Sequence, residues 1–267
     1  MKMNVVYRAL EMSKQSFHQR LNRQLVLLEE MEQLLVLVKQ IRADHPRMSS
    51  RQMYRLIKPV HLGRDRFERF CFENGFKVST KRAYHRTTNS LGVTRFENLL
   101  LDFELMDINQ VWVSDITYYR IGEKFYYLTF ILDLYSRVIV GHAVSRDLLT
   151  SSTTIVALQM ALKKRNAPKG LIIHSDGGGQ YYCKEWLQLT TKYEIRNSMC
   201  ESVYENPHAE RINGTIKNDY LAGYGPQNYI ELFEMTAKAV LKYNREKPHQ
   251  SIGNISPYEF EKILTAA

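Results

Sequence analysis

Hydrophobic residues recur at helical spacing through the first third of the chain. One long stripe lies in a helix that is predicted to end at His45-Pro46, and it consists of Leu25, Leu28, Met31, Leu34, Leu35 and Val38. Ser13 precedes the helical segment 14–21 and is a suitable N-cap for it. We expect the stripe to pack as core, although a partner helix would satisfy the same pattern.

Two shorter helical patterns follow, over residues 51–57 and 64–73. Ser49 or Ser50 can cap the first, and Gly75 is predicted to end the second. A turn through Pro59 and Gly63 separates the two helices.

Both short helices are rich in arginine, and a basic arm over residues 77–86 follows them. Short helices joined by a tight turn are typical of helix-turn-helix units that bind DNA. Residues 1–21 resemble such a unit less well and fit a plain helical hairpin better. The side chains that we expect to contact DNA here are Arg51, Arg55, Arg64 and Arg66.

The pattern changes at Gln110, where β-branched and aromatic residues become frequent. Strands are predicted over residues 111–120, 124–134 and 137–144. The connections at Gly122-Glu123 and Tyr135-Ser136 are short enough for hairpin turns. These strands should therefore form an antiparallel meander.

Helices and single strands alternate in the rest of the chain. Helices are expected over residues 150–165, 182–193, 207–221, 228–244 and 257–264, and strands over 171–174 and 195–199. The order through residue 221 is therefore β-β-β-α-β-α-β-α, and two more helices follow. We divide the chain into a helical region over 1–90, a linker over 91–108 and an α/β domain over 109–267.

The net charge of +9 is concentrated in the helical region. Residues 1–95 contain 19 Lys and Arg against 8 Asp and Glu, whereas residues 96–267 contain 18 against 20. Of those 19 cations, 13 are arginine, whose planar guanidinium binds phosphate bidentately. A solvated basic surface would have the same composition, but so one-sided an excess indicates a polyanionic partner.

Several classes of protein are excluded by composition. The chain lacks the run of about 18 apolar residues that a transmembrane helix needs, and its first residues do not resemble a signal peptide. Cys71, Cys183 and Cys200 are too widely spaced for a C-x-x-C zinc site or a disulfide framework. We expect a cytoplasmic protein with no membrane partner.

Three acidic residues occupy unusual positions. Asp115 lies in the first predicted strand, Asp176 follows the fourth, and Glu210 lies in a helical pattern. Carboxylates at the ends of core strands are costly unless a cation meets them. Mg²⁺ keeps several waters and needs few carboxylates, and two such ions can stabilise the attacking and leaving oxygens of a phosphodiester. We therefore predict that the three acids hold two Mg²⁺ or Mn²⁺ ions.

Other residues near the acids are candidates for DNA contacts. His174 suits either a phosphate contact or packing at the end of the sheet, and we favour the phosphate. Lys217 lies two helical turns beyond Glu210, about 10.5 Å along the same face, where DNA would pass. A generic surface lysine would fit the same position. The glycines after Asp176 lack the Lys-Ser/Thr of a Walker motif and should permit close backbone approach.

Conspicuous motifs surround these acids. They are Trp112-x-x-Asp-Ile-Thr-Tyr118, His174-Ser-Asp176, Gln180-Tyr181, Glu205-Asn206, Glu210 through Lys217, Tyr243-Asn244 and Pro248-His-Gln-Ser251. Together they resemble the catalytic half of the IS3-family insertion-sequence transposases of the OrfB type, bacterial relatives of the retroviral integrase core. Residues 41–90, with His45-Pro-Arg-Met48, resemble the helix-turn-helix region that precedes the core in that family.

The resemblance implies a fold and a chemistry. The fold is α/β and RNase H-like, with a mixed five-stranded sheet flanked by helices and an all-α helix-turn-helix region ahead of it. The implied metal ligands of a DDE transposase are Asp115, Asp176 and Glu210. Lys217 is implied as the helix lysine that contacts DNA, and Asn206 and Arg211 are further expected contacts. The reaction would be metal-dependent cleavage at the element's terminal repeats, followed by attack of the free 3′-OH on target DNA.

The resemblance also implies partners. We expect DNA, an OrfA-type partner or fusion, and self-association on DNA, all in the bacterial cytoplasm at the nucleoid. Ser114 stands where Thr is common in the family, and Pro207 where Ala is usual. Pro is tolerated in a first helical turn, so little damage is expected.

Two alternatives remain open. One is a catalytically silent DNA-binding regulator of the element that needs an OrfA partner. The other is an RNase H-like, structure-specific nuclease, which the basic helical region and the flanking motifs disfavour.

Overall fold

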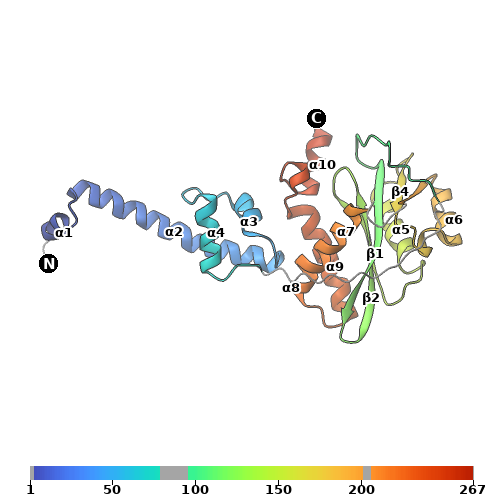
Figure 1. Ribbon diagram of the computed structural model, residues 1–267, viewed down its shortest axis with the longest axis horizontal. Helices are drawn as coiled ribbons and strands as arrows, with labels where there is room; N and C mark the ends of the chain where they lie inside the picture. The colour runs from blue at the N-terminus through green and yellow to red at the C-terminus, as the bar shows by residue number, and fades with distance from the viewer. Residues whose placement is uncertain (1–2, 79–95, 201–205, 267) are drawn as a thin grey trace. The chain divides into compact units, whose positions relative to one another are not determined.

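The computed structural model describes residues 3–78, 96–200 and 206–266, and the chain separates into two compact units, Met1–Thr80 and Lys81–Ala267 (Figure 1). The predicted boundary at residue 90, the first part of the predicted linker and most of the predicted basic arm lie outside the described residues. No described helix is long and apolar enough to cross a membrane. The three cysteines are free thiols.

The first unit is built of helices, namely α1 (Met3–Ala9), α2 (Lys14–Asp44), α3 (Ser50–Ile57) and α4 (Arg64–Glu73). Ser13 caps α2 by accepting a hydrogen bond from the backbone of Ser16, and Ser49 forms a capping box with Gln52 at α3. Gly75 follows the end of α4 at φ +77°. These ends are the ones that the sequence predicts, because each depends on a local hydrogen bond or a left-handed residue.

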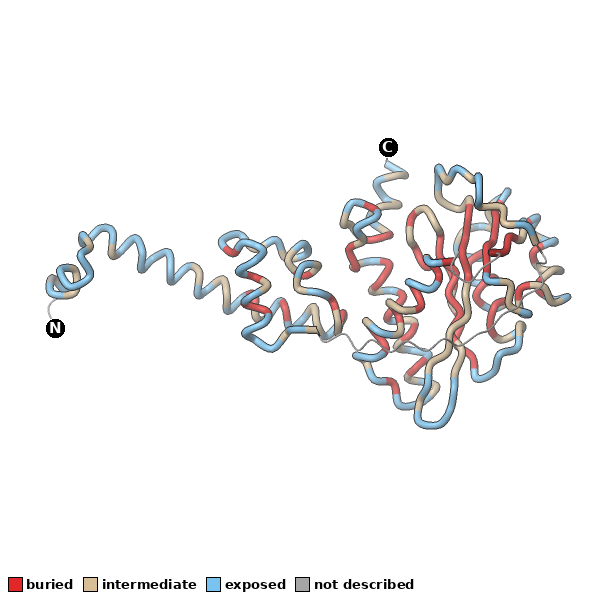
Figure 2. Tube along the Cα trace, in the orientation of Figure 1, coloured by how far each residue is buried: buried red, intermediate tan, exposed pale blue. Residues whose placement is uncertain are grey.

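The core of this unit lies around the C-terminal half of α2. Leu34 and Val38 are buried there together with Phe67 and Phe70 of α4 (Figure 2). Leu25 and Leu28 are 50% and 57% exposed, so the prediction that the whole stripe packs as core is wrong for its N-terminal part. The core formed with α3 and α4 does not extend to those residues.

The second unit contains one mixed sheet in the order β3-β2-β1-β4-β5. Its strands are β1 (Val111–Ile121), β2 (Lys124–Asp133), β3 (Ile139–Ser145), β4 (Ile172–Ser175) and β5 (Arg196–Met199). The first three are antiparallel neighbours, whereas β4 runs parallel to β1 and β5 runs parallel to β4. The predicted meander and five-stranded mixed sheet are therefore confirmed.

Helices cover both faces of the sheet (Figure 1). One face packs against α5 (Thr154–Lys164) and α6 (Lys184–Lys192), with Trp112 and Trp186 in its core. The other face packs against α7 (Pro207–Gly214) and α9 (Tyr229–Glu246). The remaining elements are η1 (Gly179–Tyr181), η3 (Thr215–Leu221), α8 (Ala222–Tyr224), η4 (Gln250–Ile252) and α10 (Pro257–Ala266).

Two predicted helices differ from the structure. The helix expected from residue 150 begins at Thr154, because Thr150 to Thr153 form turns closed by backbone bonds to Leu149 and Thr150. The helix expected over 207–221 changes to a π-helix from Thr215 to Leu221. Each π hydrogen bond reaches one residue further than an α bond, so later side chains are displaced around the helix axis.

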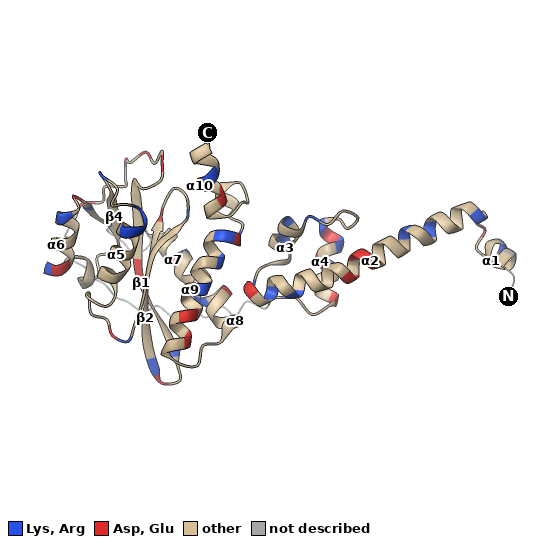
Figure 3. Cartoon of the chain, turned by 180° about the vertical axis from the view of Figure 1, so that it is seen from behind, with Lys and Arg blue, Asp and Glu red and all other residues tan. Residues whose placement is uncertain are grey.

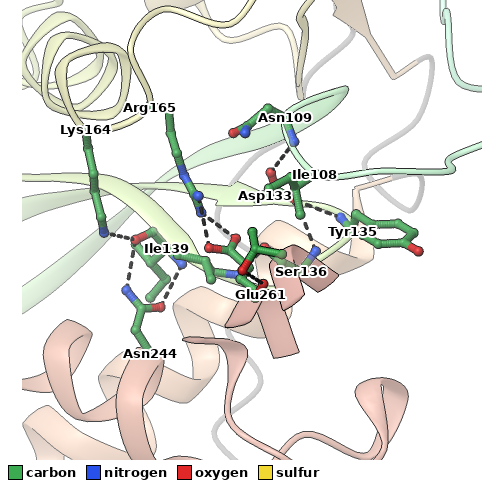
Figure 4. Close-up of polar contacts among 12 residues, drawn as sticks. Ile108, Asn109, Asp133, Tyr135, Ser136, Ile139, Lys164, Arg165, Asn244 and Glu261 are labelled. Atoms are coloured by element: carbon green, nitrogen blue, oxygen red, sulfur yellow. Dashed lines mark hydrogen bonds and ion pairs between the residues drawn. The ribbon is translucent and has the colours of Figure 1, made fainter. Parts of the chain in front are cut away.

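The turn between β2 and β3 is longer than the predicted two residues. One Asp133 carboxylate oxygen accepts 3.0 Å hydrogen bonds from the backbone N–H groups of Tyr135 and Ser136, and the other accepts from Asn109 (Figure 4). The Asn244 side chain bonds both the N–H and the C=O of Ile139, at 2.8 and 3.0 Å. These side chains satisfy backbone groups in the turn and at the first residue of β3.

Candidate active site

Asp115 lies on the face of the sheet that α7 covers. Side chains alternate along a strand, so Asp115 follows Val111 and Val113, which belong to the core on that face. One carboxylate oxygen accepts a 2.8 Å hydrogen bond from the N–H of Ile116, and the other accepts a 2.7 Å bond from the Asn213 amide. The carboxylate is therefore held from β1 and from α7.

The parallel register of β1 and β4 brings a second carboxylate to Asp115. Val111 pairs with Ile172 and Val113 pairs with His174. The same offset, continued by two residues, places Asp176 beside Asp115. Asp176 is exposed, and its carboxylate accepts a 3.1 Å bond from the N–H of Gly178.

The turn after Asp176 requires glycine at its first position. Gly177 has φ +75°, and a Cβ there would lie 1.9 Å from Cε of Met199, the last residue of β5. A side chain would be both strained and in collision with its neighbour. Gly177 thus lets the chain turn sharply away from β4 directly behind the carboxylate.

Glu210 lies on α7, which packs on the sheet through Ala209, Ile212 and Asn213. Its side chain is exposed, and its charge acts on Asp115. The helix is fixed above β1 at its start, because the buried Asn206 amide donates a 3.2 Å bond to the carbonyl of Ser114. The sheet and α7 therefore bring the three predicted acids into one region.

The electrostatics of this region are unfavourable without a cation. Burial, then the charge of Asp176 and then that of Glu210 raise the pKa of Asp115 to about 7, although the bonds from Ile116 and Asn213 oppose the shift. Across the described residues, no group of three or more His, Cys, Asp or Glu side chains is arranged to hold a metal ion. The carboxylates are close enough to repel one another but are not gathered into a complete ligand set.

The sequence predicts that Lys217 faces passing DNA, but its ammonium group lies against β1. Its ammonium donates a 2.9 Å hydrogen bond to the Thr117 hydroxyl and lies 4.9 Å from the centre of the Tyr118 ring. Burial lowers the pKa of Lys217, while the negative charge of Asp115 opposes that shift. Lys217 belongs to the π-helical segment, so the expected α-helical spacing from Glu210 does not apply to it.

The other predicted DNA contacts have varied surroundings. His174 is 1% exposed, and its Nδ1 lies 2.9 Å from the Ser198 hydroxyl, so here it joins β4 to β5. Arg211 is exposed on α7. On the first unit Arg51 pairs with Glu68 and Arg64 with Asp65, at 2.9 and 2.8 Å. Arg55 and Arg66 are exposed on the same two helices, α3 and α4, along which cations recur (Figure 3).

Two supporting residues lie within the motifs around the acids, but no role is predicted for them from the sequence. Asn213 holds the Asp115 carboxylate, and its position three residues after Glu210 was the available signal, since that spacing shares a helix face. The buried Tyr181 hydroxyl lies 2.9 Å from that of Ser114, and its ring packs edge-on against Trp186. Tyr181 thereby ties the loop after Asp176 to the centre of β1.

The second unit is similar in sequence to a known protein family. Two descriptions of the integrase core domain family match residues 107–204 and 191–257. An uncharacterized 31 kDa protein of insertion element IS600 from Shigella sonnei is 35% identical over 208 residues, which are 76% of this chain and 76% of that protein. Transposase InsF of insertion sequence IS3A from Escherichia coli strain K12 is 34% identical over 177 residues, which are 64% of this chain but 60% of InsF.

The fold is also shared with a solved viral structure. A chain of the simian T-cell lymphotropic virus intasome, solved in complex with the PP2A regulatory subunit B56 gamma, superposes with a TM-score of 0.50 and 20% identity. The superposition covers 57% of this chain and 54% of that chain. With the sheet order β3-β2-β1-β4-β5 and helices on both faces, it confirms the predicted RNase H-like fold.

Proposed function

The chain belongs to the IS3-family insertion-sequence transposases with a retroviral integrase-type core, and we propose that it cleaves DNA at the ends of its element and joins them to target DNA. The observation that carries the proposal is the convergence of three carboxylates from different elements. Asp115 lies in β1, Asp176 directly follows the parallel neighbour β4, and Glu210 comes from the helix above them.

The chemistry of the three acids suits a divalent metal, although among the described residues their side chains are not gathered into a complete ligand set. A carboxylate whose pKa is raised by burial and then by two neighbouring carboxylates is a poor arrangement unless a cation compensates it. Mg²⁺ and Mn²⁺ take oxygen ligands, and Asp115, Asp176 and Glu210 would hold two such ions. When bound, the metals lower the pKa of an attacking hydroxyl and stabilise charge on the leaving oxygen.

The chain's own residues organise this site. The Asn213 amide and the Ile116 N–H orient the Asp115 carboxylate, and the Gly178 N–H orients Asp176. Asn206 fixes the start of α7, and with it the position of Glu210. The nucleophile in our proposal is water or a DNA 3′-OH, so no covalent bond forms between protein and DNA.

DNA is the proposed partner of both units. The exposed arginines of α3 and α4 suit phosphate contacts, and Arg51 and Arg64 would exchange their acidic partners for phosphate on binding. Exposed ion pairs of this kind contribute little stability, so the exchange costs little. Because two DNA ends must be held together, we further propose self-association on DNA and an OrfA-type partner for end recognition, in the cytoplasm at the nucleoid.

One experiment tests the function and separates it from the alternatives. Purified protein is incubated with labelled element-end DNA and Mg²⁺ or Mn²⁺, beside the Asp115→Asn variant. We expect cleaved and joined strands from the wild type and none from the variant. Binding without any metal-dependent product would instead indicate a silent regulator. Cleavage of an RNA/DNA hybrid but not of element ends would indicate a nuclease.

A further inference from the structure

Arginine and histidine side chains from three parts of the fold gather at the start of α7. Arg137 lies in the turn between β2 and β3, His208 and Arg211 lie on α7, and His249 follows α9. Arg137 Nη1 is 3.0 Å from His208 Nδ1, and the His249 ring packs edge-on against Tyr243 with ring centres 4.9 Å apart. The charges of Arg137 and Arg211 act on each other and on both histidines.

The hydrogen bonds of this cluster leave donors unused. A guanidinium can only donate, so His208 Nδ1 is the acceptor and the ring hydrogen of a neutral His208 is on Nε2. Within the described part of the chain, Arg137 Nε and His249 Nε2 are buried without a hydrogen-bond partner. Buried polar atoms are nearly always satisfied, and Arg137 Nε can only donate, so a partner with lone pairs suits it; His249 Nε2 can meet the same partner in the tautomer that carries its hydrogen on Nε2.

Within the residues that the structure describes, no ion pair to an acidic side chain involves Arg137 or Arg211. Burial lowers the pKa of Arg137, Tyr243 opposes that shift, and the charge of Arg211 lowers the pKa further. Asp133 opposes the shift, but its carboxylate already accepts bonds from three backbone N–H groups. The neighbouring Lys247 is paired with Asp219 at 3.0 Å. A partly buried guanidinium beside a second arginine is costly unless an anion joins them.

The backbone conformation of Arg137 is consistent with a role in binding. Its φ of +66° lies in the left-handed region, which is uncommon for a residue with a long side chain. Such outliers persist where the surrounding structure enforces them and concentrate at binding sites. Here the Asp133 carboxylate bonds the preceding two backbone N–H groups, so the turn is fixed with Arg137 against His208.

We propose that Arg137, His208, Arg211 and His249 form a binding site for one phosphate group of the DNA strand that passes Glu210. We infer a phosphate ligand from the hydrogen-bond donors of these four side chains. The assignment of that phosphate to DNA rests on the proposed function. Arg137 and Arg211 supply charge, the Nε2–H group of His208 supplies a neutral donor, and His249 supplies another in the tautomer that carries its hydrogen on Nε2. The site would position the strand beside the carboxylates without taking part in bond breaking.

The first test measures DNA binding by the full chain in EDTA, so that it does not depend on catalysis. Arg137→Gln is compared with Arg196→Gln, which makes the same charge change at an exposed residue of the same unit. Loss of one phosphate contact should weaken binding about tenfold and lower the slope of log K against log salt by about 0.9. The Arg196 variant should keep the wild-type slope. An unchanged affinity and slope in Arg137→Gln would overturn the proposal.

The second test separates a DNA phosphate from a free anion and from a structural role. Inorganic phosphate should raise the melting temperature of the wild type above that in chloride of equal ionic strength, and should not do so for Arg137→Gln. In chloride, Arg137→Gln should melt no lower than the wild type, because it removes an uncompensated charge. A lower melting temperature with no response to phosphate in either protein would make Arg137 structural and overturn the site.

A response to inorganic phosphate with unchanged DNA binding would assign the cluster to a free anion and contradict the DNA assignment. Failure of the wild type to bind any DNA would contradict the proposed function instead. The phosphate measurement would then still decide whether the cluster is an anion site.

Discussion

The Asn213 amide lies 2.7 Å from a carboxylate oxygen of Asp115 and donates a hydrogen bond to it. This bond joins α7, which carries Glu210, to the strand that carries Asp115. Asn213 is 6% exposed, so water has little access to replace the bond if it is lost. The Asn213 amide therefore links two proposed catalytic carboxylates directly, in addition to the bond from Asn206 that holds the start of α7.

Substitution Asn213→Ala should impair catalysis more than folding. A hydrogen bond to a charged group contributes about 1.5–3 kcal/mol, so strand cleavage at neutral pH should fall by roughly ten- to a hundredfold. The acidic limb of the pH–rate profile should move to higher pH, because the pKa of Asp115 loses an interaction that lowers it. Gln188→Ala, an exposed change on α6, should leave rate and profile unchanged. An unshifted profile in Asn213→Ala would refute the positioning role.

Stability in metal-free buffer should decrease as pH rises. The pKa of Asp115 is about 7 in the folded chain against about 4 when unfolded, so the folded state binds the proton more tightly. The stability from this proton is complete below pH 4 and is lost as pH rises through 7. The shift sets a ceiling of about 4 kcal/mol, and partial solvent access should leave about 2 kcal/mol of loss between pH 5 and 8.

Urea unfolding at a series of pH values measures this loss. The unfolding free energy of Asp115→Asn should change less with pH than that of the wild type, and the variant should be the more stable of the two at pH 8. Excess Mg²⁺ should stabilise the wild type at pH 8 and have little effect on the variant. A wild type whose stability rises between pH 5 and 8 in EDTA would contradict the electrostatic account.

Gly177→Ala should destabilise the fold by about 3 kcal/mol, from about 1–2 for the left-handed backbone and the remainder from overlap with Met199. Gly170 provides the matched control, since its φ of +72° is similar but a Cβ there meets no atom within 4 Å. Gly170→Ala should therefore cost about 1–2 kcal/mol, from the backbone alone. Equal losses in the two variants, measured by denaturant unfolding, would show that Met199 does not restrict this turn.

Asn244→Ala should cost about 2–4 kcal/mol of unfolding free energy, because it removes two bonds and leaves the buried N–H of Ile139 unsatisfied. The Ile139 carbonyl keeps a 3.3 Å bond from Lys164. Gln159→Ala, an exposed helical change, should stay within about 0.5 kcal/mol of the wild type. A similarly small effect of Asn244→Ala would show that the start of β3 at Ile139 does not need the Asn244 side chain.

The parts of the fold that the sequence predicts are those determined by local chemistry. Ser13 and Ser49 cap helices through bonds within three residues, and Gly122-Glu123 closes a hairpin between strands of alternating pattern. The order of strands and helices follows from the same local periodicity. The placement of Asp176 beside Asp115 needs the parallel pairing of β1 with β4, which periodicity alone does not supply.

The details that sequence reasoning missed depend on tertiary contacts. The π-helical segment and the bond from Lys217 to Thr117 arise where the helix packs on β1. His174 is covered because β5 pairs with β4 and brings Ser198 to its ring. Asn213 supports Asp115 only because α7 packs on the sheet and brings the amide to the carboxylate.

The central claim is that Asp115, Asp176 and Glu210 act as one metal-dependent catalytic unit on DNA. The most direct measurement is the rate of strand cleavage and joining at labelled element ends with Mn²⁺, for Asp115→Asn, Asp176→Asn and Glu210→Gln, each shown to be folded and to bind DNA in EDTA. We predict a loss of about a thousandfold or more in every variant, because residues that act as a unit cannot replace one another. A variant of any one of the three that retains a rate near that of the wild type would contradict the claim.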